Sequence, residues 1–334
     1  MACMLERCLL LTADALTVTP TAAPSTGGGA TEMLPWIIAG VSLAAALALA
    51  AALAVVSRRL GRRRSCSAVR PVTEQLPTAA EATVLKVGKL HEQGMREDQQ
   101  DCFAVSPEEL EKEHGLLAVV ADGMGGLTDG AKVSRTAVSA MLDGFCSVGG
   151  EPQLVLLELL RRANDAVNGM LEADGGKKGG STLVAALARG GRLSWLTVGD
   201  SRISMLRDGE LCQLNREHVY RNELLVDAAN GLESFESALT NPRASGLTSY
   251  LGMGRLRYVD MPARAVNIRP GDRFVLMSDG VYNALGDREL RSALAAPAQD
   301  AADEIGRRIA EKGYKGQDNY TAVIIEAAAV GERG

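Results

Sequence analysis

Short aliphatic runs that stop at an aspartate are the feature of this sequence that most restricts its fold. "LLAVVA" ends at Asp122, "RFVLMS" ends at Asp279, "LSWLTV" precedes Asp200, and Asp318 precedes "TAVIIE". Runs of this length and composition are typical of buried strands. The segments "LARGGRLSW" and "MLRDGELCQL" each place a glycine-containing turn between two such runs, which predicts hairpins and antiparallel pairing.

Helical patterns separate these runs. Apolar residues recur at helical spacing over 131–145 and 152–173, the second beginning with proline, and again over 287–296 and 301–313. Mostly antiparallel strands with grouped helices predict an α+β fold rather than a doubly wound parallel sheet. The polar segment at about 217–247 has no strand pattern and is predicted to be an irregular surface flap.

An uncharged run of 23 residues, 34–56, is long enough to cross a bilayer as a helix. Six arginines and no acid follow it up to position 70, so the positive-inside rule predicts an extracytoplasmic tail at 1–33 and a cytoplasmic remainder. A cleaved signal peptide would carry its basic residues before the run, and a buried core helix would not be Ala- and Leu-rich on every face. The remainder divides into a basic linker at 57–82, a globular domain at 83–327 and a short tail at 328–334.

Charge and cysteine usage exclude several classes. The net charge of −5 offers no basic field for nucleic acid. The six cysteines contain no CxxC pair, which argues against a zinc site or a disulfide framework. The carboxylates at strand ends indicate a different kind of metal site, because acids that converge at one edge of a sheet need a cation to relieve their repulsion. An all-oxygen set suits Mg²⁺ or Mn²⁺, and none of the three histidines lies near these acids in sequence. One Asp-Gly pair alone is ordinary turn punctuation, whereas four acids at strand ends favour the metal site.

Ordered motifs extend this interpretation. "GMREDQQD", "ADGMGGLTDGAKVS", "GGSTLVAALARGGRLSWLTVGDSRISMLRDGEL", "GDRFVLMSDGVYNAL" and "DNYTAVIIE" follow one another between about residues 85 and 325. In this order they resemble the metal-dependent protein phosphatases (PPM, the type 2C serine/threonine phosphatases), and "DGMGG" favours the bacterial branch. The resemblance implies two stacked antiparallel β-sheets flanked by helices, an α-β-β-α sandwich, with a metal site at one end.

The resemblance also implies roles for individual residues. Asp122 would bridge two metal ions, the Gly123 carbonyl would bind one of them, and Asp279 and Asp318 would complete the protein ligands of the first ion. Asp200, in "GDSR", matches the ligand of a third ion in bacterial members.

Other positions match the family less closely. Arg96 matches the arginine that holds the substrate phosphate, and Asp101 would support the site from behind its ligands. Gln100 stands where the family commonly has an acid that contacts the second metal through water, and Ser245 aligns with a flap serine that can reach the third ion. Met124 replaces the histidine that eukaryotic members are thought to use as general acid.

The implied activity is hydrolysis of phosphoserine and phosphothreonine in cytoplasmic proteins by water that two or three Mn²⁺ or Mg²⁺ ions activate, without a covalent intermediate. The implied partners are phosphoproteins and an opposing serine/threonine kinase, at a membrane reached through the single span. Gln100, together with Glu217 in place of an aspartate in "NREH", motivates an alternative: a catalytically weak, phosphoprotein-binding regulator of the same fold. Sensing by the outer tail is disfavoured, because about 33 residues are too few to bury a core. His218, at the edge of the flap, is expected to be structural.

Overall fold

The computed structural model of this chain describes residues 83–125, 130–176 and 179–329. They lie within one unit, Pro77–Gly334. Among these residues, no helix is both long enough and apolar enough to cross a bilayer. The predicted tail, span and linker (1–82) lie outside the described residues, so the span at 34–56 stays a prediction.

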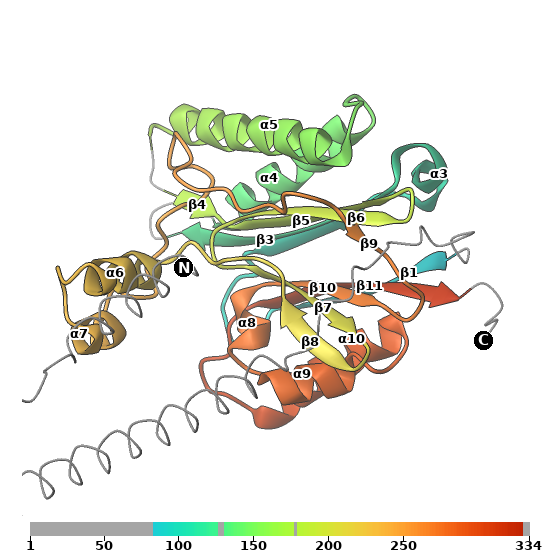
Figure 1. The fold of residues 1–334 in the computed structure, drawn as a ribbon. Helices are drawn as coiled ribbons and strands as arrows, with labels where there is room; N and C mark the ends of the chain where they lie inside the picture. The colour runs from blue at the N-terminus through green and yellow to red at the C-terminus, as the bar shows by residue number, and fades with distance from the viewer. Residues whose placement is uncertain (1–82, 126–129, 177–178, 330–334) are drawn as a thin grey trace, which may run out of the picture. The chain divides into compact units, whose positions relative to one another are not determined.

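Two antiparallel sheets stack on one another (Figure 1). In the first sheet the strand order is β1 (Thr83–Glu92), β11 (Tyr320–Ala329), β10 (Arg273–Met277), β7 (Arg202–Arg207), β8 (Glu210–Gln213). In the second it is β2 (Asp101–Val105), β3 (Leu116–Gly125), β5 (Leu183–Arg189), β6 (Arg192–Val198), β9 (Val266–Asn267), with β4 (Gly179–Ser181) paired to β3. The hairpins β5–β6 and β7–β8 are the two that the sequence predicts.

Helices cover the outer faces of both sheets. The helices α4 (Gly130–Phe145) and α5 (Pro152–Ala173) pack on the second sheet, while α9 (Asp287–Ala293) and α10 (Ala298–Lys312) pack on the first (Figure 1). Short helices η1 (Glu108–Leu110) and α3 (Glu111–His114) connect β2 to β3, and α8 (Asp279–Tyr282) follows β10. The predicted α-β-β-α sandwich is confirmed.

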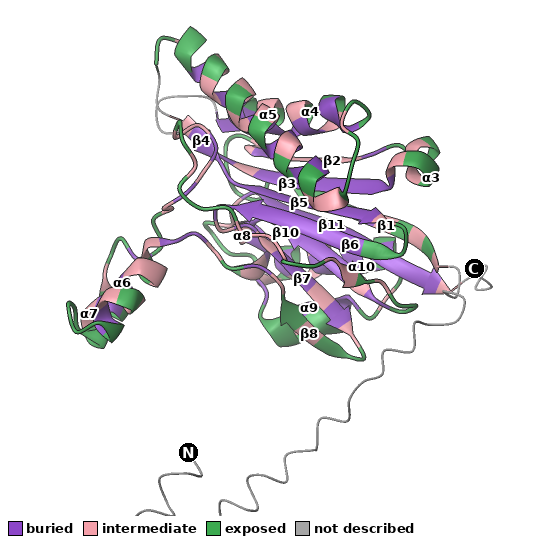
Figure 2. Ribbon diagram, turned by 45° about the horizontal axis from the view of Figure 1, so that its top comes forward, coloured by how far each residue is buried: buried purple, intermediate pink, exposed green. Residues whose placement is uncertain are grey.

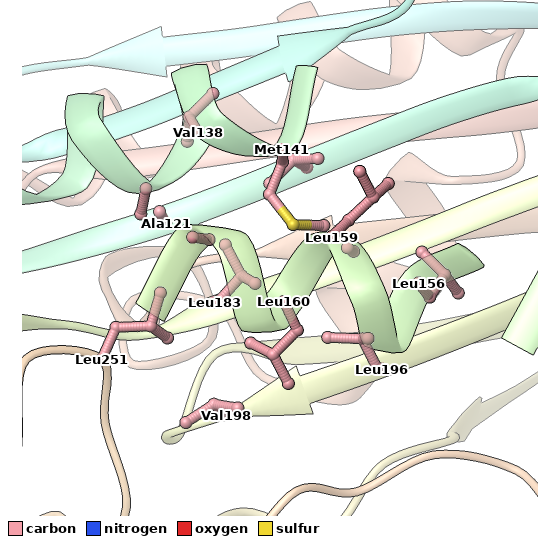
Figure 3. Close-up of a cluster of buried hydrophobic side chains, with 14 of the residues drawn as sticks. Ala121, Val138, Met141, Leu156, Leu159, Leu160, Leu183, Leu196, Val198 and Leu251 are labelled. Atoms are coloured by element: carbon pink, nitrogen blue, oxygen red, sulfur yellow. The ribbon is translucent and has the colours of Figure 1, made fainter. Parts of the chain in front are cut away.

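Three apolar layers hold the sandwich together, and β3 shows why its sequence is continuously apolar. Leu117, Val119 and Ala121 pack under α4 and α5, and Figure 3 draws part of this cluster with Ala121 labelled. Leu116, Ala118 and Val120 face the other way, into the layer between the two sheets. A strand with apolar packing on both faces cannot alternate with polar residues. The burial colours in Figure 2 show the same sheets as the most buried part of the described chain.

The structure differs from the sequence prediction in three places. The segment predicted to be an irregular flap contains two helices, α6 (Tyr220–Ala229) and α7 (Phe235–Thr240), which lie to one side of the sandwich (Figure 1). A small apolar cluster that includes Leu224 and Ala238 joins them. The edge strands β1 and β2 carry no long aliphatic run and were not predicted, and β11 extends to Ala329, beyond the predicted boundary at 327.

Candidate active site

Strand register in the first sheet brings Asp200, Asp279 and Asp318 together at one end of the sandwich. Met277, at the end of β10, pairs with Ala322 of β11 on one side and with Arg202 of β7 on the other. The end of β10 therefore lies beside the beginnings of β11 and β7. Asp279 follows β10, Asp318 precedes β11, and Asp200 precedes β7. These three acids are thereby brought together from positions up to 118 residues apart in sequence.

Asp122 joins this group from the second sheet, where it lies within β3 and not at its predicted end, because the strand continues to Gly125 by pairing with β4. Burial raises its pKa well above the ordinary range, and the negative charges of Asp101, Asp279, Asp200 and Asp318 raise it further. The Asp122 backbone is held by Thr182, which lies between β4 and β5: the Asp122 N–H donates to Thr182 Oγ1 at 3.0 Å. All four predicted carboxylate ligands thus share one neighbourhood.

Asp101 lies directly opposite Asp122 on the neighbouring strand and is buried. Ser278 Oγ donates a hydrogen bond to Asp101 Oδ2 at 2.7 Å, which links the second sheet to the end of β10 in the first. Burial raises the pKa of Asp101 to about 6, against the opposing effect of hydroxyl hydrogen bonds from Ser278 and Thr321. Asp101 therefore lies buried beside Asp122, and its supporting role toward metal ligands stays a prediction.

The remaining acids are perturbed in the same direction. Burial, followed by the charge of Asp279, raises the pKa of Asp200 to about 7. Burial and the charge of Asp318 raise the pKa of Asp279, although the Arg96 guanidinium acts against this. Mutual repulsion among buried carboxylates is relieved by a bound cation or by protonation. The site therefore has the charge that a divalent cation would neutralise.

Gly123 occupies a position where no side chain fits. A Cβ there would lie 2.1 Å from the Gly130 carbonyl oxygen and 2.7 Å from that of Gln100, and both obstacles are backbone. The Gly123 N–H donates to the Gln100 carbonyl at 3.1 Å. Gly130, the first residue of α4, in turn packs against the Gly123 carbonyl oxygen, which a Cβ on Gly130 would approach to 2.8 Å. Glycine is thus required here for packing, whether or not its carbonyl binds a metal.

Arg96 lies at the mouth of the site and contacts one of the acids. Its Nη2 is 2.5 Å from Asp318 Oδ2, and 58% of its side chain is exposed. Arg96, Asp318 and Gln100 line a cavity of about 280 Å³. An exposed guanidinium with room beside it can accept a phosphate on the face that Asp318 does not occupy.

Sequence reasoning missed Asn319, which fixes the loop that carries Arg96. Its Nδ2 donates to the carbonyls of Gln93 and Asp98, at 2.7 and 3.0 Å, and its Oδ1 accepts from the Gln100 N–H at 2.8 Å. The only signal for it in sequence is its place next to Asp318, immediately before β11. Ser278 was missed in the same way, beside Asp279.

A second missed group supports Asp200. Tyr282 Oη donates to the Asp200 carbonyl at 3.1 Å, and the Arg202 guanidinium lies 3.5 Å from the centre of the Tyr282 ring. Arg202 Nε also pairs with Glu217 Oε1 at 2.5 Å. Glu217, which motivated the alternative of a weak enzyme, is therefore a structural partner of the "GDSR" arginine.

Ser245, the predicted contributor from the flap, lies outside this cluster of contacts. Ser245 is exposed in a turn after α7, and within the described ranges its side chain makes no hydrogen bond to any of the acids. His218 is buried, and its Nδ1 accepts from the Gly199 N–H at 3.1 Å, which fits the structural role expected for it. Met124 pairs with Gly180 in the sheet and supplies no proton donor.

The donor chemistry fits Mg²⁺ or Mn²⁺, since the converging side chains are carboxylates. Among the residues that the structure describes, however, no three acidic, imidazole or thiol side chains form a ready cluster around a single ion. Several acids contact protein groups instead: Asp318 pairs with Arg96, and Asp279 Oδ2 accepts from Asn283 Nδ2 at 3.2 Å. Metal ligation by Asp122, Gly123 and the other acids stays a prediction.

Two stacked antiparallel sheets, helices on both outer faces and an acidic site at one end define this chain as an α-β-β-α sandwich with a polyanionic centre. It belongs to the protein phosphatase 2C family, whose sequence profile matches residues 87–313.

Individual relatives agree. The serine/threonine protein phosphatase PstP of Mycobacterium tuberculosis is 32% identical over 215 residues, which cover 63% of this chain and 40% of PstP. The serine/threonine phosphatase stp of Listeria monocytogenes is 29% identical over 224 residues, covering 64% of this chain and 86% of that protein. A crystal structure of the catalytic domain of PstP in complex with two manganese ions matches with a TM-score of 0.58 and 28% identity, over 74% of this chain and 100% of that chain. The matched part of the chain thus spans 40% of the length of PstP.

Proposed function

We propose that this chain is a protein-serine/threonine phosphatase that hydrolyses phosphoserine and phosphothreonine and uses Mn²⁺ or Mg²⁺. The proximity of four acids carries the proposal: the charges of Asp200, Asp279 and Asp318 raise the pKa of Asp122, and the charge of Asp279 raises that of Asp200. Membership of the phosphatase 2C family and the two manganese ions bound by PstP support it.

The residues divide the work by position. Asp122, Asp279 and Asp318, with the Gly123 carbonyl, would hold two divalent ions, and Asp200 a third. Such ions, when bound, supply positive charge against the phosphoryl oxygens and lower the pKa of water for in-line attack.

Arg96 would bind the phosphate and orient it toward the acids, by exchanging part of its contact with Asp318 for the substrate. The Tyr282 hydroxyl fixes the Asp200 turn, and the buried bond from Ser278 to Asp101 fixes the floor of the site. In this scheme no cysteine or serine nucleophile is required.

Turnover of a phosphothreonine peptide by the full chain, with and without Mn²⁺, tests the proposal. We expect hydrolysis that EDTA abolishes and Mn²⁺ restores, and a loss of about 100-fold or more in kcat for Asp279→Asn. Asp300→Asn, which removes an exposed acid from α10, is the matched control and should turn over normally. Activity that survives both EDTA and Asp279→Asn would refute the mechanism. Tight phosphopeptide binding without phosphate release would instead favour the regulator that Gln100 suggests.

We further propose that residues 34–56 anchor the chain in the cell membrane with residues 1–33 outside and the phosphatase domain in the cytoplasm, where it opposes a serine/threonine kinase. The uncharged run and the arginines after it support this orientation. Protease digestion of intact and of opened cells tests it: the domain should be cleaved only after the cells are opened. Recovery of the chain in the aqueous fraction after membrane sedimentation would contradict the anchor.

A further inference from the structure

A large cavity lies beside the acidic site, between the flap helix α6 and the segment at 257–260. It has a volume of about 640 Å³, in the range that binds ligands, and we call it the flap cavity. Glu217, one of its lining residues, pairs with Arg202, and its charge raises the pKa of Asp200. The flap cavity is thus adjacent to the acids proposed to act on phosphate.

His218 presents an unused hydrogen-bond donor to this cavity. The residue is only 7% exposed and lines the cavity wall. Its Nδ1 accepts from the Gly199 N–H, and burial lowers its pKa, so the neutral ring carries its proton on Nε2. In the described part of the chain Nε2 has no hydrogen-bond partner, yet it is not among the polar atoms sealed from solvent, which are Ser194 Oγ and Trp195 Nε1. An unpaired donor on a buried side chain that lines a cavity calls for an acceptor there, such as a peptide carbonyl.

The other walls of the flap cavity suit a polypeptide. Val226 and Tyr258 are large apolar side chains left 50% and 41% exposed on its lining. Glu223 is already engaged, with Arg257 at 3.2 Å and with the Tyr258 hydroxyl at 3.2 Å. A bound peptide could place a carbonyl oxygen at the His218 donor and an adjacent side chain against Val226 and Tyr258.

The charges that line the flap cavity indicate that the bound side chain is basic. Asp227 and Asp260 line the flap cavity, and among the described residues neither carboxylate forms an ion pair. Asp260 Oδ2 accepts only the Arg216 backbone N–H, at 3.1 Å. The Arg216 guanidinium is the one lining cation for which the described residues provide no ion pair, so unpaired acids outnumber unpaired bases.

We propose that the flap cavity binds the segment of a phosphoprotein that flanks the phosphorylated residue, and that it selects segments carrying lysine or arginine. The inference rests on the proposed phosphatase function. His218 donates to the backbone of the bound segment, Tyr258 and Val226 pack on it, and Asp227 and Asp260 hold its basic side chain.

Two phosphothreonine peptides that differ only in arginine or alanine beside the phosphorylated residue test the selection. With the full chain and Mn²⁺, we expect kcat/KM to be about threefold to tenfold higher for the arginine peptide, as partly exposed ion pairs provide. The double variant Asp227→Asn/Asp260→Asn should reduce this ratio to about one, and Arg216→Ala should increase it. Glu236→Gln removes an exposed acid of the same flap that does not line the cavity, and should keep the wild-type ratio.

Binding of the same peptides, fluorescently labelled, to Asp279→Asn separates this inference from the proposed function. Fluorescence anisotropy should give a Kd about threefold to tenfold lower for the arginine peptide, without any need for turnover. If wild type shows no turnover but the preference in Kd persists, the phosphatase proposal fails and the flap cavity stands. Equal Kd values for the two peptides, or a preference that survives the double variant, would overturn the inference.

Discussion

Two buried serines offer a sharp test of how this site is held together. Ser278 and Ser194 are both 0% exposed, so replacing either by alanine is the same chemical change in an equally buried place. Ser278 Oγ donates to Asp101 Oδ2 at 2.7 Å and accepts from the Thr321 N–H at 3.0 Å. Ser194 Oγ, in contrast, has no hydrogen-bond partner within the described residues.

The two variants should therefore change the free energy of unfolding by clearly different amounts. Ser278→Ala leaves a buried carboxylate oxygen and a buried amide without partners, and each such group costs about 1–3 kcal/mol. Because the two losses share one site and are not additive, we expect the free energy of unfolding to fall by about 2–4 kcal/mol. Ser194→Ala removes a hydroxyl that is already unsatisfied, so its effect should lie between neutral and a stabilisation of about 1 kcal/mol.

Urea unfolding of the full chain in EDTA, followed by the fluorescence of the buried Trp195, measures both. The slope m should not change, because neither variant alters the surface exposed on unfolding. EDTA excludes stabilisation of the folded state by bound metal. Equal destabilisation by the two variants would refute the reasoning, because buried hydroxyls would then contribute through packing and not through the hydrogen bonds of Ser278.

Three further outcomes follow from the geometry. Gly123→Ala forces a Cβ onto two backbone carbonyls and should destabilise the domain by about 1–3 kcal/mol or prevent folding. Gly169→Ala, in open space on α5, should instead stabilise the domain by about 0.5–1 kcal/mol. The urea midpoints of the two variants measure this, and equal shifts would contradict the packing argument. Arg96→Lys should lower kcat/KM for a phosphopeptide by about tenfold or more, because lysine lacks the two-pronged guanidinium. Its free energy of unfolding should stay within about 0.5 kcal/mol of wild type, because the ion pair with Asp318 is exposed. An unchanged kcat/KM would show that Arg96 does not bind the phosphate. Finally, the pKa of Asp101 is raised from 3.8 to about 6, so the folded state holds this proton between these two pH values and the unfolded state does not. In EDTA, the free energy of unfolding of wild type should therefore fall by about 3 kcal/mol relative to that of Asp101→Asn as the pH rises from below 4 to above 6. A difference that grows in the opposite direction would show that the carboxyl is stabilised in its charged form.

Much of this structure follows from local sequence. "LLAVVA" predicts a strand buried on both faces, and β3 has apolar packing on each side. Pro152 predicts the start of a long helix, and α5 begins at that residue. The helices of the flap were not predictable in this way, because α6 and α7 are short and only a few of their residues are buried.

The candidate site, too, has a part that local sequence predicts and a part that only the tertiary structure establishes. The sequence by itself determined that Asp200, Asp279 and Asp318 stand next to strand ends and that Asp122 follows the aliphatic run of β3, because these residues are neighbours along the chain. Only the tertiary structure decided that these ends meet, through the pairing of Met277 with Ala322 and Arg202. It also decided that Arg96 pairs with Asp318, 222 residues away, and that Asp101 is buried under Ser278. Such contacts depend on strand register and on the stacking of two sheets, and neither leaves a mark on the residues immediately around them.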